Sequence, residues 1–294
     1  MRNKIALEEY IPLDKSWIIR MGILDLTRYY KDITNFLIEK ENKEKLGDDL
    51  QALKKIAIKW DTQEPFDVGE SGTIYRFVKF YTWKMNSSRP IHLAGTLIER
   101  SKKMFKDSSA IFYSPEELLK LDNSTSQWAT MAYLLGDKRK VENPPFKLKN
   151  TYEAVEHWEL KRKNGQMWDE RVDQTILNQA KEFLKFLDRG KMNFLPEQAE
   201  DYCFARAFNI IDGETGQRKF PSLIGHETNR IVEMERTIME AEKNLAITTP
   251  DHRAVQAIVM KQIAMNKPYS IVNRNCVNKT WPKFWDFIEN IKSI

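Results

Sequence analysis

The chain has 294 residues, of which 41% are hydrophobic and 11% aromatic, so it can bury a large core and is expected to form about two domains. Its 47 basic residues exceed its 42 acidic residues only slightly, and its basic runs alternate with acidic or apolar residues, which favours solvated helix faces over nucleic-acid binding. Apolar runs of membrane-spanning length are absent, and acidic residues stand where a signal peptide would need its apolar stretch, so we expect a cytoplasmic protein without a membrane partner.

The cysteine content excludes two further classes of protein. Cys203 and Cys276 are too few and too far apart in the sequence for a disulfide scaffold or a zinc site. We therefore expect a reduced compartment, no metal and no cofactor.

In chain order, helices are predicted wherever a polar or charged start leads into an apolar stripe of helical period. These helices are expected to begin at Asp14, Gly69, Ser124, Pro196, His226 and Pro250, and a further one is expected to end at Gly165. Short apolar stretches at 110–113, 245–249 and 269–272 predict strands between the helices. This alternation is typical of an α/β fold, and we place a domain boundary near residue 170.

Several of these helix starts carry basic side chains within about two turns. A helix N-terminus presents unpaired backbone N–H groups and a partial positive charge, so it can hold an anion. Lysine and arginine prefer the last turn of a purely structural helix, and their presence near the first turn indicates a binding role. The residues in question are Lys15, Arg20, Arg76, Arg230 and Arg253. The sequence therefore predicts a protein that handles phosphate or carboxylate groups.

Read in order, these segments resemble the motifs of the 5-enolpyruvylshikimate-3-phosphate (EPSP) synthase family. The matching stretches are PLDKSWIIR at 12–20, GESGTIYR at 69–76, TSQ at 125–127, PE at 196–197, HETNR at 226–230, DHR at 251–253 and CVNKTWP at 276–282. The resemblance implies a compacted inverse α/β barrel of repeated βαβαββ units in two domains. The acceptor-side domain would be 13–170 and the other 1–12 with 171–294, with the active site in the cleft between them.

The same resemblance implies transfer of the enolpyruvyl group of phosphoenolpyruvate to a hydroxyl of shikimate 3-phosphate, with release of phosphate. This is a step of the shikimate pathway to aromatic amino acids, and a monomer is expected. The residues implied for phosphoenolpyruvate are Lys15, Gly72, Lys84, Arg89, Gln127, Arg230, Arg253 and Lys279. Those implied for the acceptor are Ser16, Arg20, Thr125, Ser126, Glu197 and His226, and those for proton transfer are Lys15, Glu197 and Glu227.

The chain departs from the family pattern at several of these positions. Glu197 replaces an aspartate, His226 replaces a lysine, and Glu70 stands where a neutral asparagine is usual. Either Lys84 or Arg89 would have to replace an arginine expected before the Arg89-Pro90-Ile91 segment. Two alternatives therefore stay open: a divergent enolpyruvyl transferase with another hydroxyl acceptor, and a catalytically impaired paralogue that binds an anionic metabolite.

Overall fold

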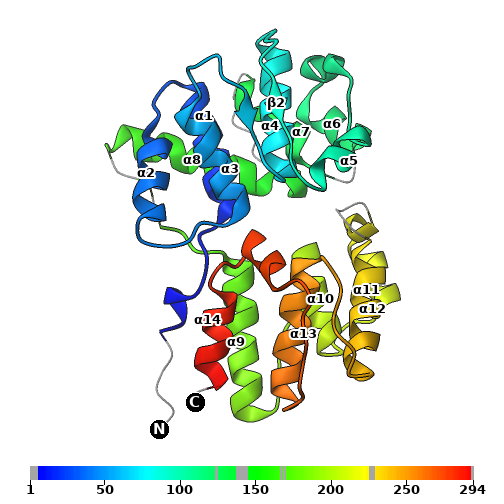
Figure 1. The fold of residues 1–294 in the computed structure, drawn as a ribbon. Coiled ribbons are helices and arrows are strands. Elements are labelled where there is room, and N and C mark those ends of the chain that lie inside the picture. The colour runs from blue at the N-terminus through cyan, green and yellow to red at the C-terminus, as the bar shows by residue number, and fades with distance from the viewer. Residues whose placement is uncertain are drawn as a thin grey trace. The chain divides into compact units, whose positions relative to one another are not determined.

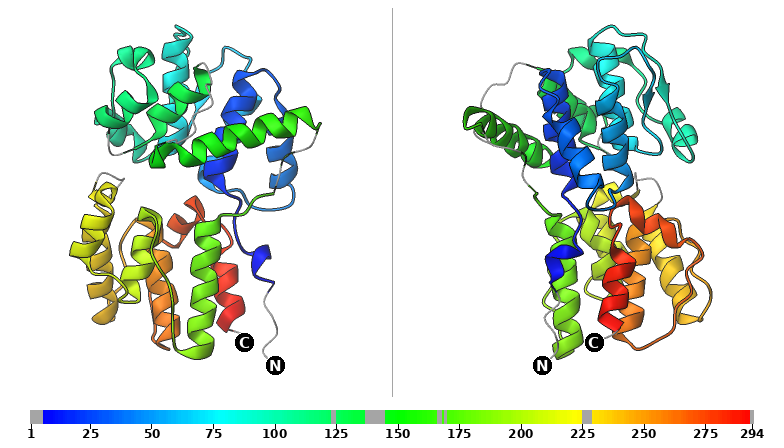
Figure 2. Two further views of the ribbon diagram at one scale, coloured as in Figure 1. Left: turned by 180° about the vertical axis from the view of Figure 1, so that it is seen from behind. Right: turned by 60° about the vertical axis from the view of Figure 1, so that its left-hand side comes forward.

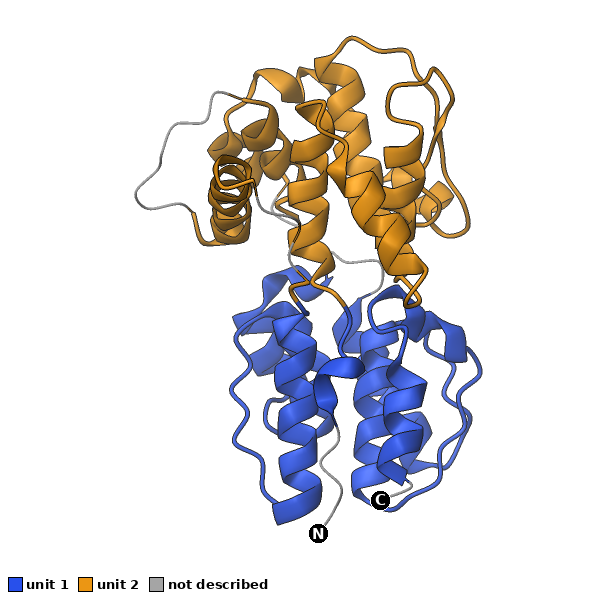
Figure 3. Ribbon diagram, turned by 90° about the vertical axis from the view of Figure 1, so that its left-hand side faces the viewer, with its two compact units in different colours: residues 1–12, 172–294 blue, residues 13–171 orange. Residues whose placement is uncertain are grey.

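The structure, a computed structural model, describes residues 6–122, 125–136, 145–165, 168, 170–224 and 229–292. The chain forms two compact units, which Figure 3 shows in different colours. Unit 1 comprises Met1–Pro12 and Val172–Ile294, and unit 2 comprises Leu13–Arg171. Within the described ranges, no helix is both long enough and apolar enough to cross a membrane.

Unit 2 is built from helices joined by short loops (Figure 1). Its α-helices are α1 (Lys15–Thr27), α2 (Asp32–Glu41), α3 (Asp48–Ile58), α4 (Gly72–Lys84), α5 (Leu97–Lys102), α6 (Pro115–Leu121), α7 (Gln127–Leu135) and α8 (Lys149–Lys163). Its short 3-10 helices are η2 (Ser108–Phe112) and η3 (Phe146–Leu148), and its strands are β1 (Phe66–Asp67) and β2 (Ile91–His92), which pair in parallel.

Unit 1 is helical as well. Its α-helices are α9 (Gln174–Arg189), α10 (Tyr202–Ala207), α11 (Gly213–Lys219), α12 (Arg230–Glu242), α13 (His252–Ala264) and α14 (Phe284–Lys292). Its 3-10 helices are η1 (Leu7–Glu9), η4 (Ala199–Asp201), η5 (Pro221–Ile224) and η6 (Arg274–Lys279). Figure 2 shows α9 in green, α13 in orange and α14 in red, side by side around a shared apolar core.

The fold class predicted from the sequence is wrong. The structure is 64% helical and 3% strand, which is not a sheet-rich inverse α/β barrel of βαβαββ units. The stretch expected as a strand at 110–113 lies largely in η2, and those at 245–249 and 269–272 meet only in a parallel bridge between Ile247 and Ile271. Apolar runs of four or five residues do not fix the conformation, because a strand also needs a neighbouring backbone to pair with. These runs are also only partly buried, since Phe112, Leu245 and Val272 are exposed.

Each unit surrounds one helix that is buried on nearly all sides. In unit 2 every residue of α1 from Trp17 to Leu26 is buried, and in unit 1 every residue of α13 from His252 to Met260 is buried. A helix that is buried all round is typical of the centre of a core rather than its edge. The packing against α1 is close, since a Cβ added at Gly22 would lie 2.8 Å from Cγ1 of Ile33.

The helix starts follow the local capping rules. Asp14, Ser71 and Asp251 precede α1, α4 and α13, and the side chain of each accepts a hydrogen bond from a backbone N–H of the first turn. Such caps satisfy donors that have no partner inside the helix. The helices predicted to start at Asp14 and Pro250 are thus confirmed within two residues, whereas α4 begins three residues after the predicted Gly69.

Candidate anion-binding site

The start of α4 is tied to two other helices by one buried carboxylate. Asp49, in the first turn of α3, is 3% exposed, and its two oxygens accept hydrogen bonds from Nζ of Lys15 and from Oγ of Ser71, each at 2.5 Å. Oγ of Ser71 in turn accepts the N–H of Ile74 at 3.2 Å and so caps α4. Asp49 therefore holds the Lys15 ammonium group next to the positive end of α4.

The first residue of α7 reaches the same place. Nε2 of Gln127 donates to Oγ1 of Thr73 at 2.8 Å, and Oε1 of Gln127 accepts from Nη1 of Arg76 at 2.8 Å. Arg76 also donates to the carbonyl oxygen of Gly72 at 3.3 Å. We call the group of Lys15, Asp49, Ser71, Arg76 and Gln127, together with Gly72, Thr73 and Arg100, the α4 cluster.

Arg100 belongs to this cluster, although the sequence did not single it out. A Cβ added at Gly72 would lie 3.4 Å from Nη1 of Arg76 and 3.6 Å from Nη1 of Arg100, so both guanidinium groups reach this glycine. Nη2 of Arg100 donates to the carbonyl oxygen of Glu70 at 2.9 Å. In the sequence, Arg100 stands at the start of a basic run. Such a run could indicate a binding residue, but it is also typical of a solvated helix face.

Glu70 does not direct its carboxylate at the cations of the α4 cluster. Its Oε2 accepts the hydroxyl of Thr96 at 3.1 Å, and its Oε1 lies 1.8 Å from the position that a Cβ on Gly95 would take. Gly95 also has a φ of +49°, which other residues rarely adopt. A glycine is therefore required at position 95, and the acidic departure from the family motif is turned toward the Gly95–Thr96 loop.

The residues implied for the acceptor in unit 2 are engaged with each other. Nη1 of Arg20 donates to Oγ of Ser16 at 2.5 Å and to its carbonyl oxygen at 2.8 Å, and Nε donates to Oγ1 of Thr151 at 2.9 Å. Burial lowers the pKa of Arg20 to about 10, and the nearby Asp14 opposes that shift. These contacts join α1 to α8 across the core of unit 2.

The other two acceptor residues of unit 2 lie at the start of α7. Oγ1 of Thr125 accepts the backbone N–H of Gln127 at 3.2 Å. Ser126 is the residue before α7, but its side chain makes no capping hydrogen bond. The structure thus brings the TSQ motif to the α4 cluster through Gln127.

Lys84 and Arg89 do not join the α4 cluster. Lys84 is exposed at the last residue of α4, about 18 Å along the helix from Gly72 at a rise of ~1.5 Å per residue. Arg89 stacks on Phe66 at 3.5 Å. It donates to three carbonyl oxygens, those of Lys59 at 2.7 Å, Trp60 at 2.8 Å and Glu64 at 2.5 Å. These contacts fix the chain after α3, which is a structural role.

In unit 1 a second cationic group forms where α12 and α13 begin. Asp251 caps α13, since its Oδ1 accepts the N–H groups of Arg253 at 2.9 Å and of Ala254 at 3.3 Å. Its Oδ2 accepts Nε of Arg230, the first residue of α12, at 3.1 Å. Arg230 and Arg253 are each only 7% exposed. We call Arg230, Asp251, His252 and Arg253 the α13 cluster.

The α13 cluster contains a buried donor without a partner. Nη1 of Arg253 is buried and makes no hydrogen bond among the described residues. A buried guanidinium donor left unpaired costs free energy, typically ~1–3 kcal/mol or more for a charged group. A ligand with acceptor oxygens would satisfy this donor.

Positive charge dominates the surroundings of this cluster. Burial lowers the pKa of His252 well below its usual 6.5, and the charges of Arg253, Lys279 and Arg230 lower it further, while Asp251 acts in the opposite sense. Because the charge of Lys279 lowers the pKa of His252, the Lys279 ammonium group lies close enough to His252 to interact with it electrostatically. Desolvation also raises the pKa of the buried Cys203 thiol, so this side chain stays protonated.

The remaining predicted site residues lie elsewhere or outside the described residues. The Glu197 side chain is exposed, and it is the backbone N–H of Glu197 that donates to Oδ2 of Asp201 at 3.0 Å. Asp201 is buried and also accepts Nε2 of Gln179 at 3.0 Å. His226 and Glu227 fall within 225–228, which the structure does not describe.

Clustered metal-ligand side chains were sought in the part of the chain that the structure describes. No group of three or more histidine, cysteine, aspartate or glutamate side chains there could hold a metal ion. Both cysteines are free, and burial raises the pKa of Cys276 to about 11, so a reactive thiolate is not favoured at either position.

Comparisons with known proteins leave the family open. No protein-family model matches the sequence, no curated protein matches it, and no solved structure matches the fold.

Proposed function

We propose that this chain binds phosphoenolpyruvate, a small anion with a phosphate and a carboxylate, and acts as an enolpyruvyl transferase. The observation that carries the proposal is the buried, unpartnered Nη1 of Arg253 at the start of α13, beside Arg230. A phosphate or carboxylate oxygen would satisfy this donor, and guanidinium groups bind both kinds of oxygen through paired hydrogen bonds.

The α4 cluster supports the same class of ligand. Lys15, Arg76 and Arg100 gather at the start of α4. Asp49 pairs with Lys15 and fixes its ammonium group there. Backbone N–H groups of a helix start and basic side chains together form a typical phosphate site.

In the proposed reaction the acceptor hydroxyl adds to the carbon of phosphoenolpyruvate that carries the phosphate, while the methylene carbon gains a proton. The adduct then loses phosphate from the first carbon and a proton from the newly formed methyl group. This restores the carbon–carbon double bond. The step needs a proton donor and a base. Shikimate 3-phosphate is the first acceptor to test.

A second candidate function is binding of the anion without turnover. The observation that favours it is the exposed side chain of Glu197, one of the residues implied for proton transfer. An exposed carboxylate is less tightly oriented toward an acceptor hydroxyl than a buried one. In this case the protein would sense or carry the anionic metabolite.

The proposal is tested by titrating phosphoenolpyruvate into the wild-type protein and into Arg253→Gln by calorimetry. Removing a charge-assisted contact should weaken binding about 10-fold or more. The substitution should not lower the melting temperature of the free protein, because it removes an unsatisfied buried group. Arg189→Gln, at an exposed position on α9, is the matched control and should leave both quantities unchanged.

Turnover separates the two functions. Phosphate release in the presence of phosphoenolpyruvate and shikimate 3-phosphate would establish the transferase. Tight binding without release, with this acceptor or with a panel of other hydroxyl compounds, would establish the binding protein. Equal affinity of the wild-type protein and Arg253→Gln for phosphoenolpyruvate would refute the assignment of the site. The cytoplasmic location and the monomeric state stay predictions.

A further inference from the structure

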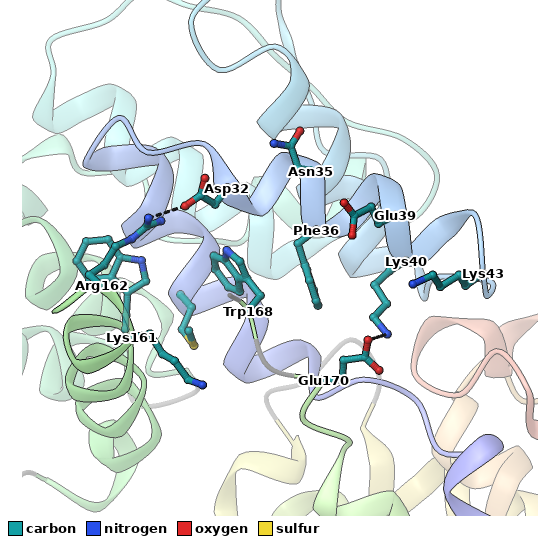
Figure 4. Close-up of a pocket in the computed structure, with 12 residues that line it drawn as sticks. Asp32, Asn35, Phe36, Glu39, Lys40, Lys43, Lys161, Arg162, Trp168 and Glu170 are labelled. Atoms are coloured by element: carbon teal, nitrogen blue, oxygen red, sulfur yellow. Dashed lines mark hydrogen bonds and ion pairs between the residues drawn. The ribbon is translucent and has the colours of Figure 1, made fainter. Parts of the chain in front are cut away.

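Unit 2 contains a pocket of about 290 Å³ that none of the sequence motifs touches. It lies beside α2 and the C-terminal part of α8, and Figure 4 shows the side chains that line it. Its volume is close to the lower end of the range for small-molecule sites, ~300 Å³, so it suits one small molecule rather than a large cofactor. Its lining residues are separate from those of the α4 cluster.

The wall of the pocket is aromatic. Phe36 of α2 and Trp168 stack with their ring centroids 5.6 Å apart and an interplanar angle of 27°. Buried Met21 and Trp158 complete the apolar lining, while Trp168 is only half-buried. In Figure 4 the indole of Trp168 lies between Phe36 and Lys161, so Phe36 covers only one side of it. A flat ring can stack on the other side, because aromatic rings pair in offset or tilted arrangements.

Buried hydrogen bonds hold this wall in place before a ligand arrives. Oδ1 of Asp25 accepts Nε1 of Trp158 at 3.3 Å, and Oδ2 accepts the backbone N–H of Ile33, in the first turn of α2, at 3.0 Å. Asp25 itself is fully buried, as are Ile33 and Leu37, which anchor α2 on both sides of Phe36 in the sequence. A wall that is already ordered costs little conformational entropy when a ligand binds.

The charges at the pocket balance. Lys40 pairs with Glu170, and Arg162 pairs with both Asp32 and the buried Asp25. With Asp25 included, basic and acidic groups are equal in number, namely Lys40, Lys43, Lys161 and Arg162 against Asp25, Asp32, Glu39 and Glu170. A charged ligand of either sign would therefore lose hydration without meeting a net opposite charge, whereas a neutral ring has little hydration to lose.

We propose that this pocket binds a neutral, planar aromatic molecule of one or two fused rings, a class that includes indoles and uncharged nucleobases. The ring stacks on the side of Trp168 that Phe36 does not cover. Contact with the apolar lining supplies the attraction, because buried apolar area and aromatic pairing both favour binding and the balanced charges contribute no net attraction. The proposal is independent of phosphoenolpyruvate binding.

Three indoles with the same ring and different charges are the probes. Indole-3-acetamide is neutral, indole-3-acetate is an anion and tryptamine is a cation at neutral pH. Each is titrated into the full chain by calorimetry. We expect the amide to bind most tightly and both ions to bind about 3-fold more weakly or worse, because their charges lose hydration without a net partner.

Trp168→Leu tests the aromatic wall. It should weaken binding of the amide about 5-fold, as expected for the loss of an aromatic pair. Trp285→Leu, at a half-buried tryptophan of unit 1, is the control and should leave the affinity for the amide unchanged.

Two charge variants upset the balance in opposite directions. Glu39→Gln should strengthen binding of indole-3-acetate about 3-fold, and Lys43→Gln should strengthen binding of tryptamine by a similar factor. Neither variant should change the affinity for the amide. Both positions are exposed on or after α2, so neither variant should disturb folding.

Several results would overturn the proposal. They are no binding of the amide at millimolar concentration, an ion that binds as tightly as the amide, and equal affinity of Trp168→Leu and wild type for the amide. Charge variants that leave the affinities of both ions unchanged would also overturn it. Arg253→Gln should not alter binding of the amide, and Trp168→Leu should not alter binding of phosphoenolpyruvate, so failure here is distinguishable from failure of the proposed function.

Discussion

His252 should make the stability of unit 1 depend on pH just below neutrality. The imidazole is 7% exposed in the first turn of α13, and burial together with the charges of Arg253, Lys279 and Arg230 lowers its pKa well below 6.5. In the folded protein it therefore stays neutral near pH 6, whereas in the unfolded chain it takes up a proton below pH 6.5. The pKa of His252 is thus lower in the folded protein than in the unfolded chain. Such a group contributes its full stability above the pKa of the unfolded chain, and this contribution is lost as the pH falls.

The magnitude follows from the proton balance. One proton bound only by the unfolded state changes the free energy of unfolding by ~1.4 kcal/mol per pH unit. Between pH 7.5 and pH 5.5 the His252 contribution should therefore fall by at most about 1.4 kcal/mol, most of it below pH 6.5. Asp251, which acts in the opposite sense, limits the shift but does not reverse its direction.

The assay is urea denaturation at pH 7.5, 6.5 and 5.5 for the wild-type protein and for His252→Gln, followed by far-UV circular dichroism and by hydrogen exchange of α13 amides. The other titratable groups are common to both proteins, so the difference between their pH profiles reports His252 alone. Parallel profiles would refute the reasoning, as would an imidazole of the folded protein that titrates near pH 6.5 by NMR. Saturating phosphoenolpyruvate should reduce the difference, because a bound anion offsets the repulsion from the neighbouring cations.

Two substitutions test the packing of the units. Gly216→Ala should destabilise unit 1 by roughly 2 kcal/mol, because the added Cβ would lie 2.2 Å from the buried ring of Tyr202. Gly213→Ala on the same helix would meet Oε1 of Glu235 at 3.2 Å and Cγ2 of Ile231 at 3.4 Å, which small shifts can relieve, so it should cost far less. Chemical denaturation measures both, and equal losses would contradict the predicted clash. Asp25→Ala should destabilise unit 2 by about 3–5 kcal/mol, since the buried Asp25 carboxylate accepts from Arg162 and its loss leaves that charge without its buried partner. A loss below ~1 kcal/mol in thermal or urea unfolding would show that this pair is not structural.

The sequence by itself predicted about half of the α-helices that the described residues form. The helix starts at Asp14 and Asp251 depend on a capping side chain and the apolar residues that follow it within one turn, and such local interactions are readable from sequence. The short apolar stretches at 245–249 and 269–272 did not identify buried surface, since Leu245 and Val272 are exposed and only Ile247 of the bridged pair Ile247 and Ile271 is buried.

The tertiary structure decided the fold class and the membership of the candidate site. A strand forms only if another backbone segment lies alongside it. A four-residue apolar run shows neither which segment that is nor how close it comes. The same holds for the cations: Arg100 and Arg89 look alike in sequence, yet one reaches Gly72 and the other donates to the three carbonyl oxygens after α3. Asp49, which fixes Lys15, is likewise 34 residues away in the sequence and meets it only through the packing of α3 against α1.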